Sequence, residues 1–165
     1  MDSTDVMQLV IVVILIGLSA FFSSAETAFT TVSKIRIRSL CEEGNKRAMK
    51  VNKIIEDSGK MLSAILIGNN IVNIGASSLA TTLAINIWGS YATAIVTGVL
   101  TLIILIFGEI TPKTLATIHA EKIALTYSNI IYGLMWVLTP VIFVVNKLSL
   151  GVLTIFRVDP SKKTN

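Results

Sequence analysis

The stretch TLIILIFGEITPKT, residues 101–114, carries an apolar run directly into a carboxylate, a proline and a lysine. The apolar part is typical of a membrane-spanning helix, but a simple span needs neither Glu109 nor Pro112. Proline has no N–H, so Pro112 cannot donate to the carbonyl of Gly108. We therefore expect the helix to break here, with a freed Gly108 carbonyl beside the Glu109 carboxylate. The alternative is that the motif only ends a helix at the membrane surface.

The composition of the whole chain indicates a membrane protein. Its 165 residues are 53% hydrophobic and 15% charged, with a mean hydropathy of +0.75, whereas about a quarter of the residues of a soluble domain are charged. The apolar residues form blocks close to the ~20 residues that cross a bilayer. No basic region precedes the first block, so we expect a retained span rather than a signal peptide. The predicted fold class is an all-α membrane protein in the lipid bilayer.

The polar segment between the first two apolar blocks is expected to be cytoplasmic. It contains seven basic residues, Lys34, Arg36, Arg38, Lys46, Arg47, Lys50 and Lys53. This clustering follows the positive-inside rule, so the net charge of +4 does not indicate nucleic-acid binding. We expect a multi-pass cell-membrane protein with its N-terminus outside. The predicted spans are residues 6–32, 61–88 and 91–111, and short cytoplasmic helices, broken near Gly44, are expected within residues 33–60.

The last apolar stretch, residues 123–156, is long enough for a fourth span, but Pro140 and Lys147 interrupt it. A fourth crossing would place three basic residues outside, against the positive-inside rule; these are Arg157, Lys162 and Lys163. We therefore expect a juxtamembrane belt over residues 112–157 and a cytoplasmic C-terminus, with a fourth span as the open alternative. Residues 1–165 are then a single membrane domain.

Two predicted spans carry a stripe of polar side chains on one face. At about 100° per residue, the first stripe contains Ser19, Ser23, Glu26, Thr27 and Thr30, and the second contains Asn69, Asn70, Asn73 and Ser77. Because polar groups cannot face lipid, the stripes must face protein or water. They either hold the helices together or line a site for a hard cation such as Mg²⁺ or Ca²⁺, which takes carboxylate, amide, hydroxyl and carbonyl oxygens. Glu26 and Glu109 could also simply pair with Arg36 or Lys113.

Three motifs, in this order, resemble the transmembrane domain of the CNNM/CorC family of magnesium transport proteins. They are FFSSAETAF at 21–29, LIGNNIVNI at 66–74 and FGEITPKTLA at 107–116. The resemblance implies a homodimer with three membrane helices per subunit, an Mg²⁺ pocket open to the cytoplasm, and Mg²⁺ export coupled to Na⁺. It implies that the metal-binding positions are Ser23, Asn69, Asn73, Gly108 and Glu109, with Ser24, Glu26 and Asn70 as neighbours of the next rank.

Members of this family continue into cytosolic CBS repeats, whereas this chain ends at VDPSKKTN. We therefore expect neither those domains nor their ATP binding here. A competing function is an Mg²⁺-binding membrane sensor or anchor that regulates attached domains without carrying ions. An enzyme is not expected, since no HExxH motif is present, His119 is the only histidine, and no serine has a candidate base nearby.

Overall fold

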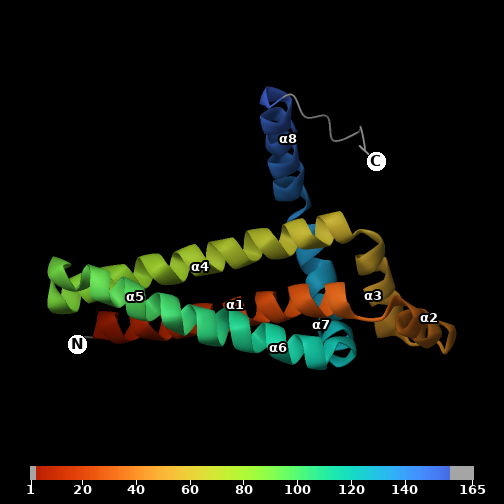
Figure 1. The fold of residues 1–165 in the computed structure, drawn as a ribbon, viewed down its shortest axis with the longest axis horizontal. Helices are drawn as coiled ribbons and strands as arrows, with labels where there is room; N and C mark the ends of the chain where they lie inside the picture. Colours follow the sequence, from red (N-terminus) through yellow and green to blue (C-terminus); the bar gives the residue numbers. More distant parts are fainter. Residues whose placement is uncertain (1–2, 157–165) are drawn as a thin grey trace.

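The computed structural model describes residues 3–156, which are almost entirely helical (Figure 1). The predicted all-α class is confirmed, and no strand occurs among these residues. In chain order the elements are α1 (Ser3–Thr31), α2 (Lys34–Glu42), α3 (Lys46–Glu56), α4 (Ser58–Trp88), the short 3₁₀ helix η1 (Ser90–Ala92), α5 (Thr93–Ile103), the π-helix η2 (Ile104–Ile110), α6 (Thr111–Ile118), α7 (Ala120–Val137) and α8 (Thr139–Ile155).

Three helices are long and apolar enough to cross a membrane, as predicted. They are α1, α4 and the continuous third helix of residues Ser90–Ile118, which contains η1, α5, η2 and α6. Gly89, with a φ of +86°, makes the turn between the second and third of them. The three lie side by side, and α1 packs against α4 as well as against η2 and α6 (Figure 1). The first span therefore packs against both of the others.

The expected helix break at Pro112 is wrong. The third helix passes through η2 and continues to Ile118. Within η2 the Thr111 N–H donates to the Ile106 carbonyl, five residues back. Pro112 is the second residue of α6 and has no N–H to donate, so the carbonyl of Gly108 lacks its α-helical donor. A wide π turn thus accommodates the proline without ending the helix.

The basic segment forms two short helices separated at Gly44, as predicted. Gly44 has a φ of +87°, a conformation that residues with a Cβ rarely adopt. Asn45 then caps α3, because its Oδ1 accepts a hydrogen bond from the Ala48 N–H at 3.1 Å. Helix α3 packs against α7 and buries Val51 and Ile54 in the main hydrophobic core. This core therefore lies where the basic segment meets the ends of α1 and α4.

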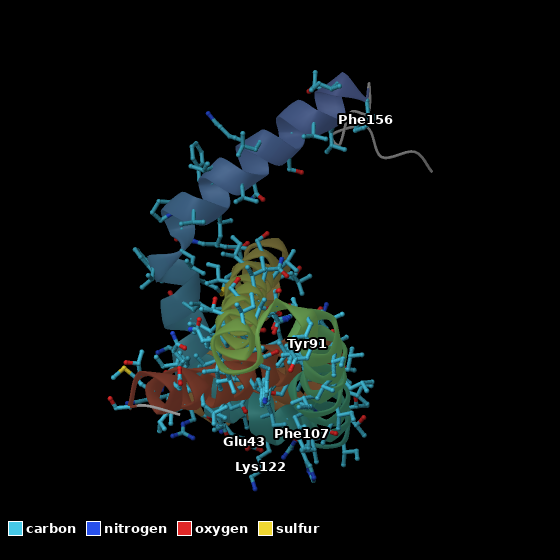
Figure 2. The ribbon with its side chains drawn as sticks, turned by 90° about the vertical axis from the view of Figure 1, so that its left-hand side faces the viewer. Glu43, Tyr91, Phe107, Lys122 and Phe156 are labelled. Carbon is cyan, nitrogen blue, oxygen red and sulfur yellow. The ribbon has the colours of Figure 1, made fainter. Side chains whose placement is uncertain are left out.

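Helices α7 and α8 run across the direction of the spans and meet at a bend of 63° (Figure 1). The bend lies at Leu138, and Pro140 occupies the first turn of α8, so the chain changes direction where Pro140 interrupts the apolar stretch. Figure 2, which looks along the spans, shows α8 leaving the bundle, and only Ile142 of α8 is buried. By length and composition the bent pair could also form one broken span. The terminal basic residues Arg157, Lys162 and Lys163 lie outside the described residues.

Candidate cation site

The three spans meet at the Ser19 hydroxyl, which is almost fully buried. Ser19 Oγ donates to Asn69 Oδ1 on α4 at 3.5 Å. On the opposite side, a Cβ atom built on Gly108 would lie 2.9 Å from the same Oγ. Only a glycine therefore lets the π-helix approach α1 at this level. Ser19 belongs to the predicted polar stripe but was not among the predicted ligands.

A second glycine brings α4 close to α1. A Cβ atom on Gly68 would lie 2.6 Å from Cζ of the buried Phe22 ring. This approach places the amides of Asn69 and Asn73, both half-buried, against the polar face of α1. Asn73 Nδ2 donates to Asn69 Oδ1 at 3.5 Å. Asn69 Oδ1 therefore accepts two long hydrogen bonds, each at the outer limit of the normal range.

Two oxygens of this region are buried without a hydrogen-bond partner in the described structure. They are Ser23 Oγ and Asn73 Oδ1, and the Ser23 side chain is 0% exposed. Leaving a polar atom buried and unsatisfied costs about 1–3 kcal/mol. Each such atom in a native fold therefore requires a physical explanation, and a cation or its water shell would supply the missing interaction.

The carboxylates of Glu26 and Glu109 are half-buried. Among the residues that the structure describes, neither carboxylate forms an ion pair or accepts a hydrogen bond. Arg36, considered above as a partner, instead pairs with Glu121 at 3.3 Å. Lys113 is exposed and forms no ion pair within residues 3–156. The structure thus does not support neutralisation of these carboxylates by neighbouring basic residues.

Two of the predicted residues lie apart from this group. Ser24 is buried, but its Oγ donates to the Phe21 carbonyl at 2.9 Å and lies 3.4 Å from the Tyr127 hydroxyl of α7. Asn70 belongs to the same polar stripe of α4 but is exposed. Contacts therefore link Asn69, Asn73 and Gly108 to Ser19. Ser23 lies one helical turn from Ser19 on α1, Glu109 is adjacent to Gly108, and Glu26 lies about one turn beyond Ser23.

The candidate metal ligands are all oxygen atoms. They are hydroxyl and amide oxygens, one adjacent carboxylate, and the Gly108 carbonyl, which would accept a hydrogen bond from residue 112 in an α-helix but cannot do so from Pro112. No group of three or more His, Cys, Asp or Glu side chains able to hold a metal ion occurs in residues 3–156. The set therefore suits a hard, oxygen-seeking cation better than zinc or another metal that prefers nitrogen and sulfur.

Comparison with known proteins identifies the family. The profile described as "CNNM: Cyclin M transmembrane N-terminal domain" matches residues 10–165. The chain belongs to the CNNM family. The membership predicted from the three motifs is thus confirmed, and all three lie inside the matched residues.

Relatives of this CNNM domain occur in bacteria and plants. A UPF0053 protein of Haemophilus influenzae is 43% identical over 88% of this chain and 35% of its own length. The inner membrane protein YfjD of Escherichia coli is 37% identical over 80% of this chain and 31% of its length. A chloroplastic DUF21 domain-containing protein of Arabidopsis thaliana is 39% identical over 90% of this chain. The chain spans about a third of the length of the two bacterial relatives.

Proposed function

We propose that this CNNM domain carries Mg²⁺ across the membrane, through a site formed by Ser23, Asn69, Asn73, Gly108 and Glu109. The observation that carries the proposal is the pair of buried, unpartnered oxygens, Ser23 Oγ and Asn73 Oδ1, on two packed spans. Each oxygen can coordinate a cation between the spans or accept a hydrogen bond from a water that the cation retains. Glu109 supplies the negative charge beside them.

The number of charges supports Mg²⁺ as the substrate. Mg²⁺ gives up its water reluctantly and is usually held by one or two carboxylates, with several waters retained. One carboxylate, two amides, a hydroxyl and a carbonyl can bind such a partly hydrated ion through direct and water-mediated contacts. A transport site must also release its ion, and a ring of several carboxylates would oppose release.

The proposal also includes the direction of Mg²⁺ transport and the ion to which transport is coupled. The cluster of basic residues on α2 and α3 supports an orientation with this end in the cytoplasm and the N-terminus outside. We propose export from the cytoplasm, coupled to Na⁺ entry as in the family that the motifs resemble. The E. coli relative is named an inner membrane protein, which supports a location of this domain in the cell membrane.

We further propose a homodimer. In each span we compare the burial of its apolar stretch of 18 residues. Within one chain 6% of this stretch is buried in the third span, against 22% in α1 and 28% in α4. Helix α4 also exposes polar side chains within the span, Asn70, Ser77, Ser78 and Thr82. Polar groups facing hydrocarbon are unfavourable. A second copy packed on this side would cover them and complete the pocket.

We do not propose enzymatic activity. His119, the only histidine, is exposed at the junction of α6 and α7. The residue is thus separated along the third helix from the polar group around Ser19, and it belongs to no group of three or more His, Cys, Asp or Glu side chains able to hold a metal ion in the described part of the chain.

Net Mg²⁺ flux into sealed vesicles of purified protein, with and without a Na⁺ gradient, tests the proposal. We expect flux with the unaltered chain and with Asn86→Ala, but not with Asn73→Ala. Both variants remove an asparagine amide from α4, but Asn86 is exposed near the end of the helix, away from the proposed site. If the unaltered chain binds Mg²⁺ without any flux, the domain is a sensor or anchor and the transport proposal is wrong.

A further inference from the structure

A cavity of about 370 Å³ lies at the corner where α3 meets α4, against the end of α7. It is separate from the cation site, which lies between α1, α4 and η2. Asp57 and Lys60 of this corner flank the first turn of the second span. The cavity is therefore at the level of a membrane surface, on the side of the basic helices.

The two walls of the cavity differ in chemistry. One wall is charged and consists of Lys53, Glu56, Asp57 and Lys60, and the other consists of Tyr132, Met135 and Trp136 of α7. Trp136 is 68% exposed, and exposed Trp and Tyr at a membrane surface are typical anchors between headgroups and hydrocarbon. A ligand that matches both walls must itself have a polar end and an apolar end.

The charged wall contains two cations and two anions that do not pair with each other. Within residues 3–156 no ion pair joins any of the four side chains, although Lys53 and Asp57, like Glu56 and Lys60, are four residues apart along the chain. Glu56 accepts one hydrogen bond, from Asn52 Nδ2 at 3.2 Å. Both lysines and both carboxylates thus remain available to a ligand that carries one charge of each sign.

We propose that this cavity binds phosphatidylethanolamine from the adjacent leaflet. Its phosphate complements Lys53 and Lys60, and its primary ammonium can donate hydrogen bonds to Glu56 and Asp57. The trimethylammonium of phosphatidylcholine has no N–H to donate, and phosphatidylglycerol has no ammonium group to pair with the two carboxylates.

The apolar residues next to the cavity also complement the acyl chains of the lipid. Helix α8 begins three residues after Trp136 and exposes large apolar side chains along its length, among them Phe143, Val144 and Leu148. Acyl chains of a lipid seated against Trp136 would contact this surface. The lipid would thus bridge the corner of α3 and α4 to α7 and α8.

The chain's two tryptophans provide a local readout, since Trp136 lines the cavity and Trp88 lies at the other end of α4. A Trp88→Phe protein reports lipids at the cavity, and a Trp136→Phe protein is the matched control. Each is placed in phosphatidylcholine vesicles with a minor fraction of one lipid carrying brominated acyl chains, which quench tryptophan. For Trp136 we expect a relative association constant about fivefold higher for brominated phosphatidylethanolamine than for brominated phosphatidylcholine, and no preference for Trp88.

Charge variants decide which groups are responsible. Glu56→Gln with Asp57→Asn should reverse the preference at Trp136 from phosphatidylethanolamine to phosphatidylglycerol, an outcome that misfolding cannot produce. Lys53→Gln with Lys60→Gln should abolish the preference for either lipid. The control pair Glu42→Gln with Glu43→Gln, exposed at the end of α2, should change nothing. Equal quenching by all three lipids, a phosphatidylglycerol preference in the unaltered charge set, or equal enrichment at both tryptophans would overturn the proposal.

Discussion

Gly108 of the third span lies so close to Ser19 of α1 that a Cβ atom at position 108 would be 2.9 Å from the Ser19 hydroxyl oxygen. The same hydroxyl donates to Asn69 on α4. One missing side chain therefore allows all three spans to meet at a single buried polar atom. The candidate ligands owe their proximity to this contact.

Replacing Gly108 with alanine should push Ser19 away from its present position. Overpacking of this kind typically costs about 1–3 kcal/mol, so we expect Gly108→Ala to lower the melting temperature and to weaken Mg²⁺ binding. Gly17→Ala is the matched control, because a Cβ on Gly17 meets nothing within 4 Å and alanine favours a helix by up to about 1 kcal/mol. Equal melting temperatures for the two variants would show that the close approach at Gly108 does not exist.

Ser23→Ala and Ser24→Ala should have opposite effects, although the residues are neighbours. Ser23 Oγ is buried without a partner, so removing it should leave the metal-free protein as stable or more stable while Mg²⁺ affinity falls. Ser24 Oγ donates to the Phe21 carbonyl and lies near the Tyr127 hydroxyl. Its loss should cost about 0.5–1.5 kcal/mol and leave Mg²⁺ affinity unchanged. Thermal melts with and without Mg²⁺ measure the metal-free stability and the Mg²⁺ affinity of each variant. If both variants change the Mg²⁺ affinity equally, Ser23 is not a metal-binding position distinct from Ser24.

The proposed topology predicts which single cysteines a membrane-impermeant reagent reaches. In a Cys41→Ser background, which removes the only native cysteine, Ser3→Cys should be labelled from outside intact cells. Lys46→Cys and Lys162→Cys should be labelled only after permeabilisation. Labelling of Lys162→Cys from outside would mean that α7 and α8 form a fourth crossing, and the juxtamembrane belt would be wrong.

Features that depend on neighbouring residues could be predicted from the sequence. The number of long apolar helices follows from block length, and the separation of α2 from α3 follows from Gly44 with its positive φ and Asn45 as a cap. The polar faces of α1 and α4 follow from helical periodicity. Their buried members, Ser19 and Ser23, lie on the predicted stripe.

Features that depend on the packing of distant segments could not be predicted from the sequence. A π turn adds a residue without changing composition, so hydropathy cannot distinguish η2 from a broken helix at Pro112. Ser24 resembles Ser23 in sequence, and only the position of Tyr127, 103 residues away, separates their environments. Ser19 was not predicted as part of the site because its importance depends on Gly108 from the third span.

The most direct test of the proposed cation site is the stabilisation of the Glu109→Gln variant by Mg²⁺. Ligand at about 100 times its Kd stabilises a fold by about 2.7 kcal/mol, or about 5–10 °C in melting temperature for a domain of this size. We expect that shift in the unaltered protein and in Glu121→Gln, which removes an exposed carboxylate paired with Arg36. Glu109→Gln should melt at the same temperature as the unaltered protein without Mg²⁺ and should lose most of the shift. A Glu109→Gln protein that Mg²⁺ still stabilises fully would contradict the assignment.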